Sequence, residues 1–211
     1  PVIVKTQSED GFSIHADSII EAITPRTKAI IINSPANPTG ALIEESELAR
    51  VAEAASTHGV WVIVDLCYEQ LIYDKQAHNL VKILFDRMRD RTVIAGSASK
   101  SYAMTGLRCG WTIGPPELIK ACNTILSHAT SNVSSITQKA ALAALAGPQD
   151  DVIRMLNEYR VRRDNMHEWL TSHPGIKCVR PKGAFYLFPD FSGLFSPDGV
   201  NSSAQFAEEL L

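Results

Sequence analysis

The chain has 211 residues, of which 45% are hydrophobic and 20% are charged, and its formal net charge is −3. This composition predicts a globular protein with a substantial core and excludes a disordered segment. The slightly acidic balance, without a run of Lys or Arg, excludes the electrostatic surface of a nucleic-acid binder, and no apolar stretch approaches the ~20 residues that span a membrane. We therefore expect a cytoplasmic protein that acts on small molecules.

Short β-branched segments alternate with amphipathic segments in the first half of the chain, a pattern typical of βα units on a largely parallel sheet. Four strands are predicted, at residues 28–32, 60–64, 92–95 and 108–113. Between the first two strands, one apolar stripe at helical spacing consists of Leu48, Val51, Ala52 and Ala55. The stripe predicts a buried helix that ends at His58, because Gly59 is a natural C-terminal cap.

Beyond Pro115 the pattern becomes mainly helical. Three helices are predicted, at residues 117–127, 134–146 and 149–171. The dipeptide Gly147-Pro148 separates the last two helices, and the turn from His173 to Gly175 closes the third. Two short strands are then predicted, at residues 176–180 and 184–188.

This order of elements predicts two domains, with the boundary within the last long helix. Residues 1–160 are expected to form a large α/β domain, and residues 161–211 to begin a smaller one. The chain starts at Pro1 instead of a methionine, and its last residues, 203–211, have a helical pattern. We therefore expect a fragment of a longer protein.

Polar residues gather where the predicted strands end, which in open α/β sheets is where ligands bind. The first strand runs into residues 33–40, which are rich in Pro and Asn and taken alone indicate an ordinary turn. The second strand ends in Asp65, followed by Tyr68. A buried carboxylate costs several kcal/mol unless a cation meets it, although Asp65 alone is equally consistent with a helix cap.

The third strand ends in a loop of small residues, Ser97-Ala98-Ser99-Lys100-Ser101, and Arg108 follows. Hydroxyls, backbone N–H groups and a guanidinium are suited to binding a phosphate. The glycine spacing of a Walker-type nucleotide loop is missing. Taken alone, Lys100 would more often be an exposed surface lysine.

Together and in order, these segments resemble the class I and II aminotransferases of fold type I, a family that includes aspartate aminotransferases. The matching motifs are Asn37-Pro38-Thr39-Gly40, Asp65 with Tyr68, Ser97-x-x-Lys100 with Arg108, Gln138 to Leu142, Arg162-Arg163-Asp164, and Gly183-Ala184-Phe185-Tyr186. The resemblance implies a three-layer αβα large domain that binds pyridoxal 5'-phosphate. This chain would supply later strands of its seven-stranded sheet and the start of a small α+β C-terminal domain.

The resemblance also implies catalytic roles. Lys100 would hold pyridoxal phosphate as a Schiff base and then move the α-proton of the substrate. Asp65 would face the pyridine nitrogen and keep it protonated, which makes the ring an electron sink. That protonated nitrogen would be the cation that a buried Asp65 needs.

Five further residues would bind the cofactor according to the same resemblance. Tyr68 and Asn37 would hydrogen-bond the phenolic oxygen of the ring, and Ser97, Ser99 and Arg108 would hold the phosphate. A serine in a tight loop can equally bond its own backbone, as we note for Ser99.

No metal site is expected, because the six histidines and four cysteines lack metal-ligand spacing. Many relatives have an acidic residue directly after the strand-end aspartate, whereas this chain has Leu66-Cys67 between Asp65 and Tyr68. We interpret Cys67 as a small buried side chain, with a reactive thiol as the alternative.

The implied reaction is transfer of an amino group from an L-amino acid to a 2-oxo acid by a homodimer. A carbon–sulfur lyase is an alternative, because it would hold the same cofactor with the same residues. A non-catalytic domain of a transcription regulator is a second alternative. It is disfavoured because the chain has no basic recognition helix and keeps the full catalytic set.

Overall fold

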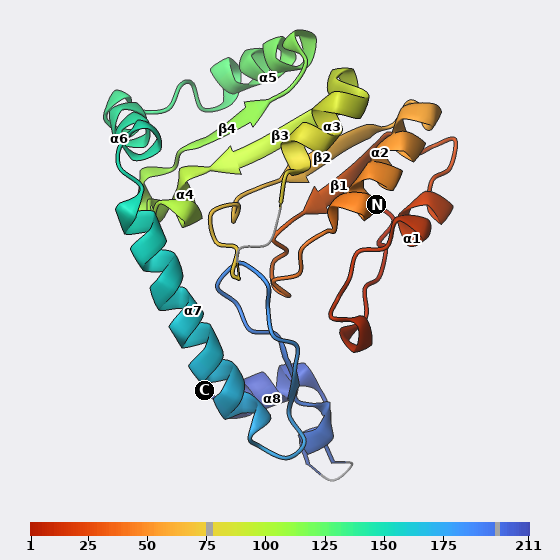
Figure 1. The fold of residues 1–211 in the computed structure, drawn as a ribbon, viewed down its shortest axis with the longest axis vertical. Coiled ribbons are helices and arrows are strands. Elements are labelled where there is room, and N and C mark those ends of the chain that lie inside the picture. Colours follow the sequence, from red (N-terminus) through yellow and green to blue (C-terminus); the bar gives the residue numbers. More distant parts are fainter. Residues whose placement is uncertain (75–77, 197–198) are drawn as a thin grey trace.

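The computed structural model describes residues 1–74, 78–196 and 199–211. Four strands form one sheet in the order β1 (Ala29–Asn33), β2 (Trp61–Asp65), β3 (Thr92–Ser97) and β4 (Gly110–Ile113). Strands β1, β2 and β3 are parallel, whereas β4 is antiparallel to β3 (Figure 1). All four predicted strands are confirmed, and the prediction of a parallel sheet holds for the first three.

Helices connect and follow these strands. The α-helices are α1 (Ala16–Glu21), α2 (Glu45–His58), α3 (Leu80–Met88), α4 (Ala98–Ser101), α5 (Pro116–Ala129), α6 (Ser135–Ala146), α7 (Asp150–Thr171) and α8 (Ser203–Glu209). Short 3-10 turns lie at Ser8–Asp10, Arg89–Arg91, Thr105–Leu107 and Ser192–Leu194. Figure 1 shows α7 extending away from the sheet toward α8 and the C-terminal segment.

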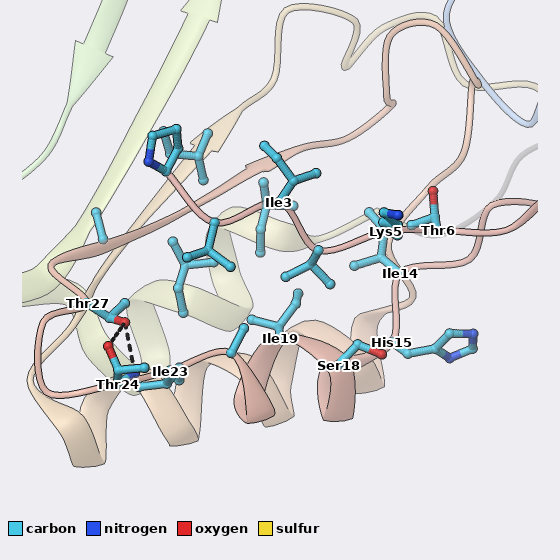
Figure 2. A pocket seen from close by; sticks show the side chains of 18 of the residues that line it. Ile3, Lys5, Thr6, Ile14, His15, Ser18, Ile19, Ile23, Thr24 and Thr27 are labelled. Atoms are coloured by element: carbon cyan, nitrogen blue, oxygen red, sulfur yellow. Dashed lines mark hydrogen bonds between the residues drawn. The ribbon is translucent and has the colours of Figure 1, made fainter.

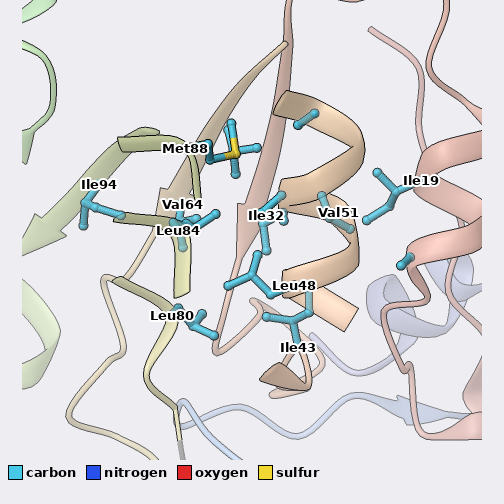
Figure 3. Close-up of a cluster of buried hydrophobic side chains, with 14 of the residues drawn as sticks. Ile19, Ile32, Ile43, Leu48, Val51, Val64, Leu80, Leu84, Met88 and Ile94 are labelled. Carbon is cyan, nitrogen blue, oxygen red and sulfur yellow. The ribbon is translucent and has the colours of Figure 1, made fainter. Parts of the chain in front are cut away.

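The main core lies between one face of the sheet and helices α2 and α3 (Figure 3). Alternate strand residues such as Ile32, Val62 and Val64 are buried on this face. They meet the four residues of the predicted apolar stripe, which are all fully buried in α2: Leu48, Val51, Ala52 and Ala55. Full burial of each large aliphatic side chain stabilises the fold by about 1.5–3 kcal/mol.

The predicted end of this helix is also confirmed. Gly59 has φ of 65°, and its N–H bonds the carbonyls of Ala55 and Ser56, as in a left-handed C-terminal cap. The other face of the sheet is much less covered, because Ile31 is 73% exposed and α5 contains no buried residue. The core is therefore one-sided within the described residues.

Three of the predicted strand segments differ from the structure. The segment 176–180 contains only the short strand β5 (Lys177–Cys178), which pairs antiparallel with β6 (Pro189–Asp190). Residues 184–188 form no strand, because Ala184 has φ of 59° and bends the chain so that its N–H bonds the carbonyl of Leu71 at 2.8 Å. Arg108 also lies outside β4, since its φ of 53° breaks the extended backbone.

The bend at Ala184 belongs to a segment that is hydrogen-bonded to the loops that follow β1 and β2. The carbonyl of Gly40 accepts hydrogen bonds from the N–H groups of Lys182 (3.1 Å) and Gly183 (2.9 Å). The N–H of Tyr73 bonds the carbonyl of Lys182 at 2.9 Å, and the Tyr73 hydroxyl donates to the carbonyl of Ala184. Residues 182–184 therefore have a fixed position relative to the ends of β1 and β2.

The long helix α7 is attached nearby. Arg163 is buried on this helix, and its Nη1 donates to the carbonyl of Pro181 (3.1 Å) and to Asp74 Oδ2 (3.2 Å). Its guanidinium carbon lies 4.3 Å from the centre of the Tyr73 ring, within cation–π distance. Helix α7 and the segment 182–184 are thus both attached next to Tyr73.

Replacing Gly40 by alanine is expected to destabilise the complete protein by about 2 kcal/mol or more. Gly40 has φ of 67°, and an added Cβ would contact Pro181 and lie 2.6 Å from the carbonyl oxygen of Gly183. Urea unfolding measures the effect. Gly106→Ala is the matched control, because a Cβ there meets no atom within 4 Å. Equal unfolding midpoints for the two variants would contradict this account of Gly40.

Candidate active site

The predicted site residues follow three neighbouring parallel strands. Asn33 at the end of β1 is in register with Asp65 at the end of β2, and Asp65 is in register with Ala95 of β3. The side-chain amide of Asn33 donates to the backbone carbonyl of Asp65 at 3.2 Å. Lys100 comes shortly after, in α4, which directly follows β3 (Figure 1). Asp65 and Lys100 therefore lie at or just beyond the carboxyl edge of the sheet, where ligands bind in open α/β sheets.

Cys67 lies beside the two charged residues of this group. Its N–H donates to Asp65 Oδ1 at 2.9 Å, which orients the carboxylate. Burial raises the pKa of the Cys67 thiol, the charge of Asp65 raises it further, and the charge of Lys100 acts in the opposite direction. Asp65 and Lys100 thus lie close enough to one thiol for both to affect it. The raised pKa keeps the thiol protonated at neutral pH, which favours the interpretation of Cys67 as a small packed side chain.

Lys100 is half-buried in the short helix α4, whose N-terminal cap is Ser97. The Ser97 hydroxyl accepts a hydrogen bond from the Ser99 N–H at 3.0 Å and donates to the carbonyl of Cys109 at 3.3 Å. This arrangement links the end of β3 to the start of β4 and fixes the turn that carries Lys100. Lys100 Nζ lies 5.7 Å from the centre of the Phe185 ring.

Tyr68 also contacts Phe185 and is only 4% exposed. The two rings meet edge to face, with centroids 5.5 Å apart. The Tyr68 hydroxyl is 2.6 Å from the hydroxyl of Tyr186, and Asn37 Nδ2 donates to the same Tyr186 oxygen at 3.4 Å. Burial raises the pKa of Tyr68, so its hydroxyl stays protonated at neutral pH.

The three predicted phosphate-binding residues are close in sequence but are not joined by contacts between their side chains. Ser99 is buried, and its described hydrogen bonds are made by its backbone. Arg108 is exposed, and its Nη1 donates to the carbonyl of Thr105 at 3.0 Å. Among the hydrogen bonds of the described residues, none links Arg108 to Ser97 or Ser99. The structure thus connects Lys100 with Tyr68 through Phe185, and Asn37 with Tyr68 through Tyr186.

Phe185 and Tyr186 reach the site from a distant part of the chain, since Tyr186 is 118 residues away from Tyr68. The sequence pattern alone indicated core aromatic residues in a strand. The segment Gly183-Ala184-Phe185-Tyr186 also matches a family motif, and lining of the substrate side by Phe185 and Tyr186 was the alternative interpretation. Their contact with Tyr68 depends on the bend at Ala184.

A cavity with a volume of about 950 Å³ lies elsewhere in the described part of the chain (Figure 2). It is lined by the N-terminal residues, by α1 and by β1, and Figure 2 shows isoleucine side chains such as Ile3, Ile14 and Ile19 around it. Lys100, Asp65 and Tyr68 do not line it. This cavity is therefore not the candidate active site.

Two other findings concern the described part of the chain. Residues 1–74, 78–196 and 199–211 contain no group of three or more His, Cys, Asp or Glu residues arranged to hold a metal ion. They also contain no helix with the length and apolar character needed to cross a membrane.

Comparisons with known proteins agree with the geometry. The family model for aminotransferase class I and II matches residues 1–211. The aspartate aminotransferase of Geobacillus stearothermophilus is 41% identical over 211 residues, which is the whole of this chain and 54% of that protein. An aspartate/prephenate aminotransferase of Cereibacter sphaeroides is 43% identical over 217 residues and is also covered to 54%. The chain thus spans about half the length of these curated relatives.

Solved structures show the same fold. The aspartate aminotransferase from Rhizobium meliloti superimposes with a TM-score of 0.93 at 37% identity, over 100% of this chain and 54% of that one. A Thermus thermophilus aspartate aminotransferase variant gives a TM-score of 0.87 at 36% identity, over 99% of this chain and 56% of that one. The predicted fold class is confirmed: a mixed α/β structure of fold type I that covers part of the large domain. The chain belongs to the class I and II aminotransferase family.

Proposed function

We propose that the complete protein transfers an amino group from an L-amino acid to a 2-oxo acid with pyridoxal 5'-phosphate as its cofactor. The observation that carries the proposal is the clustering of Lys100, Asp65 and Tyr68 at the carboxyl edge of β1, β2 and β3. Membership of the aminotransferase family supports it. The names of the relatives make aspartate and prephenate the first compounds to test.

The chemistry of the donor set fits pyridoxal phosphate. When bound, this cofactor supplies an aldehyde that reacts with primary amines and a pyridine ring that accepts electrons from the α-carbon. Lys100 offers a primary amine on a turn fixed by the Ser97 cap. Asp65 offers a carboxylate oriented by the Cys67 N–H, suited to a protonated ring nitrogen. The set therefore contains a group for each reactive position of the cofactor.

The proposed catalytic work falls to Lys100 and Asp65. The Lys100 amine would hold the cofactor covalently and, once released by the substrate amine, take the proton from the substrate α-carbon. The negative charge of Asp65 would keep the ring nitrogen protonated by favouring its charged form. One lysine would thus serve both for attachment and for proton transfer.

The remaining predicted residues would bind and orient the cofactor. The protonated hydroxyl of Tyr68 and the amide of Asn37 would donate to the phenolic oxygen of the ring. Ser97, Ser99 and the guanidinium of Arg108 would hold the phosphate by charge-assisted hydrogen bonds. Arg108 is free to turn toward an anion because its exposed side chain has only one described hydrogen bond, to Thr105.

The wider organisation follows the same proposal. Residues 1–160 would belong to the cofactor-binding domain, and residues 161–211 would begin the small C-terminal domain. The complete protein would work as a homodimer in the cytoplasm.

Product analysis of the complete protein tests the proposed function. With an amino acid labelled with ¹⁵N at its amino group, a 2-oxo acid and the cofactor, the label should appear in a new amino acid, in equal amount to the 2-oxo acid formed from the donor. Mass spectrometry of both products measures this balance. A first panel contains aspartate as the donor and prephenate among the acceptors.

Other product patterns would overturn amino transfer. Release of pyruvate and ammonia from a cysteine-type substrate without an acceptor would indicate the carbon–sulfur lyase. Cofactor binding without any turnover over the panel would indicate the non-catalytic regulator domain.

A further inference from the structure

The Tyr186 hydroxyl lies between two side chains that are proposed to bind the phenolic oxygen of the cofactor. Its oxygen is 2.6 Å from the Tyr68 hydroxyl oxygen and 3.4 Å from Asn37 Nδ2. We propose that Tyr186 is a positioning residue of the site, which orients the Tyr68 hydroxyl so that its hydrogen is available to the cofactor. This inference rests on the proposed function and adds a residue that acts through Tyr68.

The direction of the hydrogen bonds follows from the chemistry of the groups. The amide nitrogen of Asn37 can only donate, so the Tyr186 oxygen accepts. Each tyrosine hydroxyl has one hydrogen, and Tyr68 needs its own for an anionic oxygen of the cofactor. In that arrangement Tyr186 donates to Tyr68, so the hydrogen bonds run from Asn37 through Tyr186 to Tyr68.

The position of Tyr186 is fixed independently of this network. Residues 182–184, which precede Phe185 and Tyr186, are hydrogen-bonded to Gly40, Leu71 and Tyr73. Its ring packs on Phe185, with centroids 4.8 Å apart, and meets the Tyr68 ring edge to face at 5.7 Å. The hydroxyl contact therefore lies on a constrained backbone between packed rings.

A hydroxyl that accepts a hydrogen bond becomes a stronger donor, by ~10–30% per bond in a chain. Tyr186 would therefore strengthen the bond that Tyr68 gives to the cofactor and prevent the Tyr68 hydrogen from turning away. Tyr68 is only 4% exposed, which limits the water that could replace the Tyr186 hydroxyl. Loss of the Tyr186 hydroxyl should thus weaken the stabilisation of the anionic oxygen.

Tyr186→Phe in the complete protein tests the proposal, because it removes the hydroxyl and keeps the ring. Tyr68→Phe removes the hydrogen-bond donor itself. It should raise the spectroscopic pKa of the bound cofactor by about one unit. Tyr186→Phe should raise the same pKa by about a third of that amount and weaken cofactor binding. Tyr159→Phe is the matched control, because Tyr159 stacks on Phe185 at 5.4 Å from the same cluster.

A second measurement on the cofactor-free protein examines the hydroxyl contact directly. With ¹³Cζ-labelled tyrosine, the NMR signal of Tyr68, assigned through its loss in Tyr68→Phe, should move in Tyr186→Phe and stay in place in Tyr159→Phe. An unchanged Tyr68 signal, or a cofactor pKa equal to that of Tyr159→Phe, would overturn the proposal. If the wild-type protein binds no cofactor, the proposed function fails, and the NMR comparison alone decides whether Tyr186 positions Tyr68.

Discussion

Lys100→Ala in the complete protein is expected to abolish the absorbance of the covalently held cofactor and to reduce amino transfer by more than about 10⁴-fold. The reason is that one amine performs both attachment and proton transfer. Lys100 is half-buried in the turn after β3, beside Phe185 and close to Cys67 and Asp65. Absorbance spectra and the ¹⁵N transfer assay measure the two losses.

Two comparison variants make this result specific. Lys100→Arg keeps the positive charge but provides no primary amine, so it should lose both signals as well. Lys120→Ala, at an exposed position of α5, should keep both. The assignment of Lys100 would be wrong if borohydride reduction still fixed the cofactor to the Lys100→Ala protein.

Asp65→Ala is expected to leave cofactor attachment at Lys100 intact and to slow removal of the substrate α-proton by about 10²- to 10³-fold. Without the carboxylate, the pyridine nitrogen loses its proton at neutral pH and the ring accepts electrons poorly. The rate of deuterium exchange at the α-carbon measures this step.

Asp65→Asn separates charge from shape at the same position. An amide oxygen can still accept the hydrogen bond from the Cys67 N–H, so the local backbone should be retained. The exchange rate should nevertheless fall as far as in Asp65→Ala. Asp86→Asn, on the exposed side of α3, should exchange at the wild-type rate. A wild-type rate in Asp65→Asn would refute the proposed electrostatic role.

The sequence predicted the sheet well because its strands and helices have clear local signals. The stripe of α2, its cap at Gly59 and the break at Gly147-Pro148 all depend on residues that are neighbours along the chain. The antiparallel direction of β4 was not predicted, because strand propensity is the same for both directions. The predicted strand at 184–188 is wrong for a related reason. Hydrogen bonds from residues 182–184 to Gly40 and Leu71, which are far away in the sequence, set the backbone conformation of this segment.

In the candidate site, too, positions set by local sequence were predictable, whereas contacts with distant residues were not. The positions of Lys100, Asp65 and Tyr68 were predictable, since each follows the end of a parallel strand, and such ends meet at one edge. The contacts made by Tyr186 were not predictable from pattern, because they depend on the bend at Ala184. The backbone conformation of Arg108 was also not predicted, since this left-handed residue was assigned to a strand.

Two of the attachments of the C-terminal part lie next to each other, because Arg163 of α7 bonds Pro181, one residue before the segment that meets Gly40. A body that is held near one point can swing about that point as a pivot. The displacement of each residue then grows with its distance from the pivot, so α8 would travel through a wide arc while Tyr186 would hardly move. A rotation about this pivot would therefore change the position of α8 more than the geometry around Tyr68.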